Sequence, residues 1–111
     1  MKLWLDDVRP PPDDTWAWAT CAKDFSAFFA DFKITEISFD HDIASEDYFG
    51  NEITGYHLLC GIEKEFQNNP DFQLPKMQVH SANPVGRQKM QKVIDALERR
   101  DNETRTQRHL A

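Results

Sequence analysis

Three short clusters of polar side chains contain most of the chemically reactive groups in this sequence. They are Asp6-Asp7, Asp40-His41-Asp42 and His80-Ser81-Ala82-Asn83. Each cluster directly follows a short apolar run that is typical of a buried strand. The C-terminal ends of parallel strands share one edge of a sheet, and α/β proteins bind their ligands at that edge. We therefore predict that most of these acidic and imidazole side chains converge on a single site.

The carboxylates of such a site need a positively charged partner. Like charges that lie together raise one another's pKa values and are costly unless a cation neutralises them. Carboxylate oxygens suit Mg²⁺ or Mn²⁺, and a histidine among the ligands favours Mn²⁺ or another transition metal. The composition of the clusters therefore predicts a divalent cation as a cofactor.

Donors for an anion are predicted at the same edge. Helices are expected to begin at Thr54-Gly55 and at Asn83-Pro84, and the free N–H groups and dipole of a helix N-terminus attract anions. Gly86 would let a ligand approach the backbone, and Arg87 and Arg9 could each donate to a phosphate. Carboxylates for a cation beside donors for an anion suit a phosphate ester as the ligand.

Four short strands are needed to position these groups. The apolar runs predict strands over 2–7, 16–20, 34–39 and 77–79. The polar segment 43–53 is expected to be an exposed loop that is longer than a simple connection requires.

Three helices are predicted between and after these strands. Phenylalanines at i, i+3, i+4 and i+7 predict a helix whose apolar stripe spans 25–32. Thr54 as N-cap predicts a second helix, which should end at Asn68-Asn69-Pro70. Asn83 as N-cap and Pro84 at the first helical position predict a third helix, whose buried stripe ends at Leu97.

The alternation of strands and helices predicts an α/β fold with a parallel sheet and right-handed crossovers. We expect a sheet of about four strands in the order 2-1-3-4, flanked by helices, with no fifth strand and no antiparallel strand. The link between the first two strands is only 8–15, and its three prolines exclude a helix. This link is therefore expected to be an extended loop.

Length and composition limit the classes of protein that remain. The chain has 111 residues, which suits one domain, and we predict it over 1–98, followed by a charged tail over 99–111. A solvated, frayed tail is the favoured interpretation, although its arginines could contact a polyanion. The net charge of −6 disfavours a duplex-DNA binder. No apolar stretch is long enough for a membrane span and the N-terminus does not fit a secretory signal, so a cytoplasmic location is expected.

Four motifs in this sequence resemble those of a known family. In order they are Leu-Trp-Leu-Asp-Asp-Val-Arg-Pro-Pro, Ile-Ser-Phe-Asp-His-Asp, Thr-Gly-Tyr and Val-His-Ser-Ala-Asn-Pro-Val-Gly-Arg-Gln-Lys-Met. An acidic pair after the first strand and an aspartate after the third resemble the receiver domain of two-component signalling, which has a flavodoxin-like fold. The four motifs together resemble a receiver-like family proposed to process cyclic phosphates, which is common in phages and bacteria. Two features depart from ordinary receivers: the fifth-strand lysine is missing, and His41 and His80 are present.

The resemblance and the chemistry of the side chains together predict a role for each cluster. The acidic pair of a receiver holds magnesium and its third-strand aspartate accepts phosphate, so Asp6, Asp7 and Asp40 would be the metal-binding residues. Ser81 approximates the hydroxyl residue that receivers carry after the fourth strand. His41 or Asp42 would position or deprotonate a water molecule, and His80 would protonate the leaving oxygen. The predicted substrate-binding residues are Arg9, Thr54, Gly55, Ser81, Asn83, Gly86 and Arg87.

The leading hypothesis is therefore a metal-assisted phosphodiesterase that hydrolyses a cyclic phosphate. Its substrate would be a cyclic nucleotide signal or the 2′,3′-cyclic phosphate end of an RNA, and one implied setting is phage counter-defence in the host cytoplasm. Metal-free catalysis by the two histidines is an alternative mechanism. A domain that sequesters a nucleotide without turnover, or a phosphoacceptor switch, is the alternative function. The sequence makes no prediction of the oligomeric state.

Overall fold

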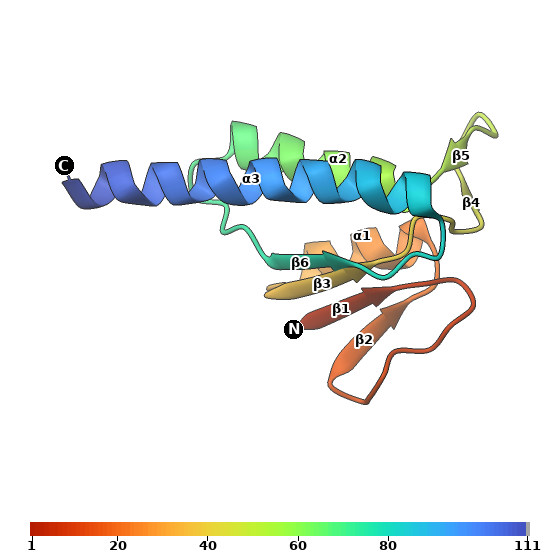
Figure 1. The fold of residues 1–111 in the computed structure, drawn as a ribbon. Helices are drawn as coiled ribbons and strands as arrows, with labels where there is room; N and C mark the ends of the chain where they lie inside the picture. The colour runs from red at the N-terminus through yellow and green to blue at the C-terminus, as the bar shows by residue number, and fades with distance from the viewer. Residues whose placement is uncertain (111) are drawn as a thin grey trace.

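The computed structural model describes the backbone of residues 1–110 and the side chains of residues 1–106. A four-stranded sheet and three helices form most of the chain (Figure 1). The elements in chain order are β1 (Lys2–Leu5), β2 (Trp16–Ala19), α1 (Ala22–Asp31), β3 (Glu36–Phe39), β4 (Ser45–Glu46), β5 (Glu52–Ile53), α2 (Gly55–Asn68), β6 (Lys76–Val79) and α3 (Pro84–Leu110).

The main sheet has the predicted topology. Its strand order is β2-β1-β3-β6, and all three pairings are parallel. This is the expected order 2-1-3-4, with β6 as the fourth strand, so the predicted fold class is confirmed. The proline-containing link 8–15 crosses from β1 to β2 without a helix, as its composition predicts.

The expectation that no antiparallel strand occurs was wrong. Segment 43–53, which we expected to be a loop, contains the two-residue strands β4 and β5, which pair antiparallel as a separate hairpin. Its turn is closed by the carboxylate of Asp47, which accepts hydrogen bonds from the backbone N–H groups of Phe49 and Asn51. Gly50 has a φ of 82°, a left-handed conformation that glycine adopts without a steric cost. Strands of two residues are too short to show the alternation that predicts a strand.

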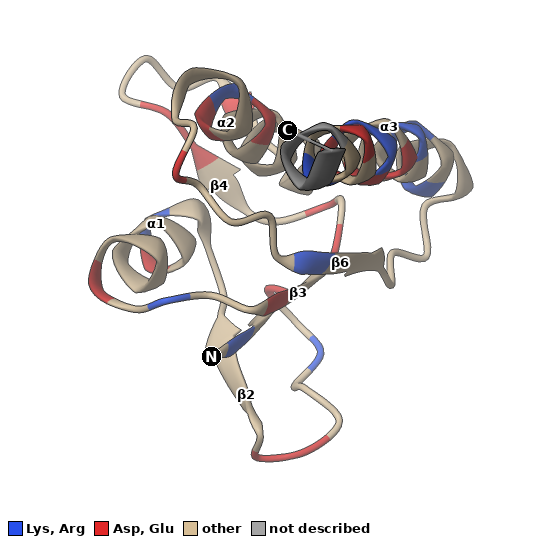
Figure 2. Cartoon of the chain, turned by 90° about the vertical axis from the view of Figure 1, so that its left-hand side faces the viewer, with Lys and Arg blue, Asp and Glu red and all other residues tan. Residues whose placement is uncertain are grey.

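All three helices pack on one face of the sheet. That face presents Leu3 and Leu5 of β1, Ile37 and Phe39 of β3, and Met77 of β6, and all five side chains are buried. They contact the apolar stripes of the helices in one core, and Figure 2 shows α1, α2 and α3 on the same side of the strands.

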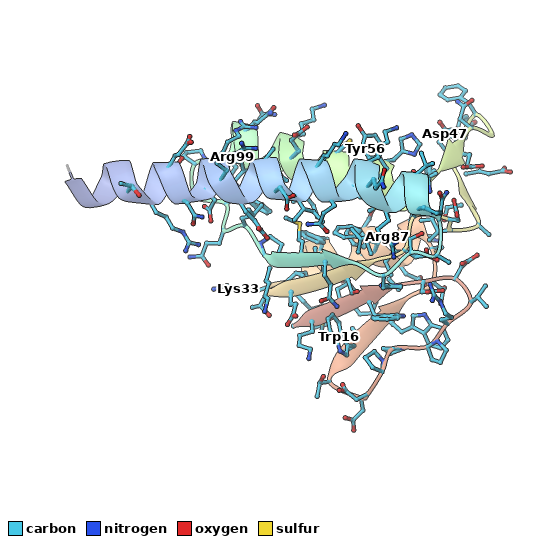
Figure 3. The ribbon with its side chains drawn as sticks, in the orientation of Figure 1. Trp16, Lys33, Asp47, Tyr56, Arg87 and Arg99 are labelled. Atoms are coloured by element: carbon cyan, nitrogen blue, oxygen red, sulfur yellow. The ribbon has the colours of Figure 1, made fainter. Side chains whose placement is uncertain are left out.

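The opposite face of the sheet carries no helix within residues 1–110. Its aromatic side chains are Trp4, Trp16 and Trp18, which follow the two-residue period of β1 and β2. Figure 3 shows Trp16 on the side of the sheet away from α3. Parallel sheets usually have helices on both faces, so in this protein a layer of tryptophans stands where a second helical layer is usual.

Helix α3 is longer than the sequence predicts. Its buried stripe does end at Leu97, but the helix continues to Leu110 instead of fraying after residue 98. Arg100 lies over the ring of Phe66 on α2, and Arg105 pairs with Asp101 one turn before it. This part of the helix has no apolar stripe. It is stabilised by the aliphatic portions of long charged side chains, which pack on neighbouring residues, and by ion pairs along the helix. The Arg108 side chain and Ala111 lie outside the described residues.

None of the helices described over residues 1–110 combines the length and the apolar character that crossing a membrane requires.

Two glycines of α2 provide a matched test of this packing. A Cβ atom added at Gly55 would collide with the backbone oxygen of Asp40, whereas one added at Gly61 would meet no atom. We expect Gly55→Ala to lower the free energy of unfolding by about 1–3 kcal/mol, as overpacking does. We expect Gly61→Ala to raise it by about 0.5–1 kcal/mol, because alanine is the better helix former. Urea unfolding of both variants checks this, and equal effects would contradict the close contact between α2 and Asp40.

Candidate active site

The ends of β1 and β3 bring three carboxylates together. Asp6, Asp7 and Asp40 each place one oxygen within 4.8 Å of the others. Asp6 and Asp40 are buried and Asp7 is half-buried. Adjacent strands in register produce this convergence, since Leu5 pairs with Phe39 and the two acidic clusters follow these residues directly.

Asp6 is the most heavily bonded of the three carboxylates. Its Oδ1 accepts the backbone N–H groups of Val8 at 2.8 Å and Arg9 at 2.7 Å. Its Oδ2 lies 3.2 Å from Nε of Arg9 and 3.1 Å from Nε2 of His80. A carboxylate offers about four acceptor positions, so all those of Asp6 are filled by protein donors.

His80 follows β6 and is held on three sides. Its ring stacks on Trp4 with centroids 3.8 Å apart and 4° between the planes. Nδ1 lies 2.7 Å from Oγ of Ser38, while Nε2 lies against Asp6. The ionised Asp6 carboxylate can only accept, so Nε2 carries the ring hydrogen. Nδ1 of the neutral ring then accepts from the Ser38 hydroxyl, whose oxygen accepts from Gln78 at 3.1 Å. This assigns His80 the tautomer that carries its hydrogen on Nε2 and donates it to Asp6.

The Asp6, His80 and Ser38 side chains therefore form a chain that joins carboxylate, imidazole and hydroxyl. Such a chain would suggest a nucleophilic serine if the hydroxyl were accessible. Ser38 is fully buried at the centre of the sheet. The Ser38 hydroxyl therefore orients the imidazole and cannot reach a substrate.

His41 and Asp42 form a second pair closer to solvent. Nδ1 of His41 lies 2.8 Å from Oδ1 of Asp42, and Asn83 donates to the other Asp42 oxygen at 3.3 Å. The His41 ring packs on the first turn of α3, where a Cβ atom added at Gly86 would lie 2.5 Å from Cγ of His41. Among the described residues, none forms a hydrogen bond with Nε2 of His41. A carboxylate thus orients one ring nitrogen, and the other keeps its hydrogen-bonding capacity with respect to the described residues.

The residues predicted to bind an anion are used in different ways. Arg9 is half exposed and donates to Asp6 and to the backbone oxygen of His80. Gly55 gives its N–H to the backbone oxygen of His41, and the N–H of buried Thr54 is donated to His57. The start of α2 is therefore occupied by protein acceptors.

The start of α3 is capped as the sequence predicts. Asn83 accepts the N–H of Gly86 at 3.1 Å. Ser81 is buried and accepts the N–H of Asn83, so its hydroxyl stabilises the turn that leads into the helix. Figure 3 shows Arg87 near this end of α3, beside the loops that carry the acidic clusters. Arg9 and Arg87 are the predicted anion ligands that the structure leaves most accessible.

Sequence reasoning missed the residues that orient the site. Trp4, Ser38 and Gln78 lie inside strands, where the sequence predicts no role beyond the strand itself, yet they hold His80 in position. A polar Ser38 inside the run Ile-Ser-Phe was the one available signal. His57, which accepts the Thr54 N–H, was also missed.

Burial and hydrogen bonds shift the ionisation of these groups. Burial alone would raise the pKa of Asp6, but the N–H donors of Arg9, Val8 and His80 and the charge of Arg9 hold that pKa below its ordinary value. Burial lowers the pKa of His80, although Asp6 and Asp40 oppose the shift. The hydrogen bond from His41 lowers the pKa of Asp42. At neutral pH the site therefore combines ionised Asp6 and Asp42 with a neutral His80.

The three carboxylates fit a hard divalent cation by their donor chemistry. Asp7 accepts the N–H of Ala44 on one oxygen, and Asp40 accepts the N–H of His41 on one oxygen. The second oxygen of each accepts no hydrogen bond from the described residues. Asp6 could join them as a ligand only by giving up a bond to Arg9 or His80. Asp7 and Asp40 are therefore the principal candidates to hold the metal.

Comparison with known proteins supports the resemblance seen in the sequence. The family model of the cyclic-phosphate processing receiver domain matches residues 1–96. The chain belongs to this family. No curated protein and no solved structure matches it significantly. The family description links the domain to cyclic-phosphate processing, and its matched range covers every residue of the candidate site.

His80 is expected to be important for stability as well as for the site. We expect His80→Ala to cost about 2–4 kcal/mol of unfolding free energy, because it leaves a cavity beside Trp4 and removes the partners of Asp6 and Ser38. His57→Ala is the matched control, since His57 is exposed and its loss removes one helix-capping bond worth about 1 kcal/mol. Urea unfolding of both variants checks this. Equal losses would show that the His80 network does not stabilise the fold.

The lowered pKa of His80 also predicts how stability depends on pH. The unfolded chain protonates this histidine more readily than the folded chain does, so stability should fall as the pH drops below about 6.5. The pKa of Asp6 is also held below its ordinary value of 3.8. Protonation of Asp6 should therefore cause a second loss of stability when the pH falls below that value. Unfolding free energies at pH 7.5 and 5.5, measured with a chelator present, check the first effect. His80→Gln should reduce that difference, and an unchanged difference would assign it to other groups.

Proposed function

We propose that this domain is a phosphodiesterase that opens a cyclic phosphate, with a 2′,3′-cyclic RNA end or a cyclic nucleotide as substrate. The observation that carries the proposal is that Asp42 orients His41 and leaves its Nε2 without a hydrogen bond from the described residues, while His41 directly follows Asp40 of the cluster of Asp6, Asp7 and Asp40. A base for water and a site for a cation are the two components that hydrolysis of a phosphodiester uses. The family description of cyclic-phosphate processing agrees with this chemistry.

Asp7 and Asp40 would hold the cation, because each keeps a carboxylate oxygen available. Bound Mg²⁺ or Mn²⁺ would polarise a phosphoryl oxygen and neutralise part of the negative charge of the phosphate. Asp40 lies at the end of β3, next to His41 in the chain, so the cation and the base would approach the same phosphate.

His41 is the proposed general base. Its Nδ1–H is donated to Asp42, which leaves Nε2 as an acceptor for a proton of water. The water oxygen forms the new bond to phosphorus, and one ring P–O ester bond breaks. His41 takes a proton from the water at Nε2 and, as imidazolium, returns a proton to the released alcohol oxygen, so the protons balance. Asp42 stabilises the imidazolium that exists between these two transfers.

His80 is proposed as a positioning residue instead of the acid that the sequence suggested. The ring hydrogen on Nε2 is donated to Asp6, and Nδ1 accepts from Ser38, so giving a proton to a leaving oxygen would break the bond to Asp6. While it is held in place, His80 fixes Asp6, and Asp6 in turn fixes the backbone and side chain of Arg9. Arg9 and Arg87 are the proposed ligands of the phosphate oxygens.

A phosphoacceptor switch is a weaker candidate. An ordinary receiver uses a lysine on its fifth strand, and the described sheet ends at β6. Sequestration of a nucleotide without turnover remains an outcome of the experiment below. A cyclic nucleotide signal as the substrate would be compatible with a role in phage counter-defence.

Hydrolysis of a panel of cyclic phosphates tests the proposal. The panel contains nucleoside 2′,3′-cyclic phosphates, 3′,5′-cyclic nucleotides, cyclic dinucleotides and an RNA with a cyclic phosphate end, each assayed with Mg²⁺, with Mn²⁺ and with a chelator. We expect one class to be opened to a phosphomonoester, with activity lost in the chelator. His41→Ala should reduce kcat by about 10²–10⁴-fold, as loss of a general base does, and Asp40→Asn should abolish the response to metal.

Asp14→Asn is the control variant, since this exposed carboxylate lies outside the cluster and should retain full activity. Tight binding of a panel member with no product would replace the hydrolase by a sequestering domain. Hydrolysis that survives the chelator would favour the metal-free mechanism. No binding and no hydrolysis across the panel would overturn the proposal.

A further inference from the structure

Two aromatic side chains at the tip of the β4–β5 hairpin have no role in the fold. Tyr48 is 97% exposed and Phe49 is 84% exposed, more than any other large hydrophobic side chain among the described residues. Their rings contact each other edge to face, with centroids 5.5 Å apart. Burial of a phenylalanine is worth about 1.5–3 kcal/mol, and at this position the fold does not obtain that stabilisation.

The hairpin is nevertheless a well-ordered support for these rings. Asp47 closes its turn with three hydrogen bonds, two of them to backbone N–H groups and one to the Asn51 amide. At its base, Ser45 accepts the N–H of Ala22 on α1, and Ala44 donates to Asp7. The tip is thus presented in a defined geometry, which lowers the entropy lost when a partner binds.

The charged side chains of the hairpin are all acidic. Glu46 and Glu52 lie directly opposite each other in the antiparallel pair, where like charges are destabilising. Asp47 adds a third carboxylate beside Tyr48. Residues 34–63 contain no lysine and no arginine. A cationic ligand would relieve this repulsion, and arginine and lysine also bind the faces of aromatic rings.

We propose that the β4–β5 hairpin is a docking site for a basic segment of a protein partner. Aromatic residues are enriched at the centres of protein interfaces, and the carboxylates beside them supply charge complementarity. The hairpin projects past the N-terminus of α2, away from β1 and β2 (Figure 1). Ala44 at the base of the hairpin donates to Asp7, but the aromatic tip is not part of the acidic cluster, and the docking proposal does not depend on the function proposed for that cluster.

Other occupants fit the hairpin less well. A nucleic acid or an anionic lipid surface needs cations to neutralise phosphates, and the hairpin has none. A second copy of this chain would carry the same net charge of −6, and that repulsion opposes self-association.

The test is a titration of the ¹⁵N-labelled full chain with an arginine- and leucine-rich peptide, followed by amide chemical shifts. We expect shifts centred on residues 43–53. The double variant Tyr48→Ala/Phe49→Ala should raise Kd about tenfold, as the loss of an aromatic anchor does. The double variant Glu46→Gln/Glu52→Gln should raise Kd and reduce its dependence on salt. Phe32→Ala is the control, because Phe32 is 51% exposed at the C-cap of α1, and it should leave Kd unchanged.

Four results would overturn the proposal. Shifts spread over the acidic side chains of α1, with the same Kd for the double alanine variant, would indicate nonspecific charge attraction. If the peptide causes no change but an oligouridylate shifts the amide signals of residues 43–53, the tip would be assigned to nucleic acid. The same result with phosphatidylserine vesicles would assign it to a membrane. A concentration-dependent mass in sedimentation, abolished by the double alanine variant, would assign it to a second copy of the chain.

Discussion

The architecture of the site depends on one buried charge, the carboxylate of Asp6. A carboxylate removed from water is very costly unless hydrogen bonds and opposite charge replace its hydration. In this protein the replacement comes from two backbone N–H groups, one guanidinium and one imidazole. The chain after β1 must therefore turn back over Asp6, and the loop after β6 must bring His80 to it. Trp4, Ser38 and Gln78 then hold His80 in place.

Much of the fold follows from local patterns. Short apolar runs that end in polar clusters predicted the four parallel strands, and Asn83 with Pro84 predicted the start of α3. The errors occurred where no periodic pattern exists. The β4–β5 hairpin depends on the side-chain bonds of Asp47 and a positive φ at Gly50, and the extension of α3 depends on Arg100 packing against Phe66. Contacts between distant residues decide such segments.

The site was predictable to a lesser degree. Strand order was enough to bring Asp6, Asp7 and Asp40 together. Sequence could not show that Asp6 has all its acceptor positions filled, or that His80 uses both ring nitrogens while His41 uses one. These differences distinguish residues that position other groups of the site from residues that keep an atom available to bind a ligand. They depend on how many donors surround each group, which only the three-dimensional arrangement determines.

The uncovered face of the sheet has a spectroscopic consequence. All three tryptophans of the sequence lie on that face, and none belongs to the helical side of the core. The tryptophan fluorescence of the protein therefore originates entirely from one side of the sheet. Trp4 stacks on His80, and the Trp18 indole donates to the backbone oxygen of Asp6 at 2.7 Å. Two of the three tryptophans are thus in direct contact with the residues that organise the acidic cluster. Changes in that cluster should therefore change the intrinsic tryptophan fluorescence, with no added label.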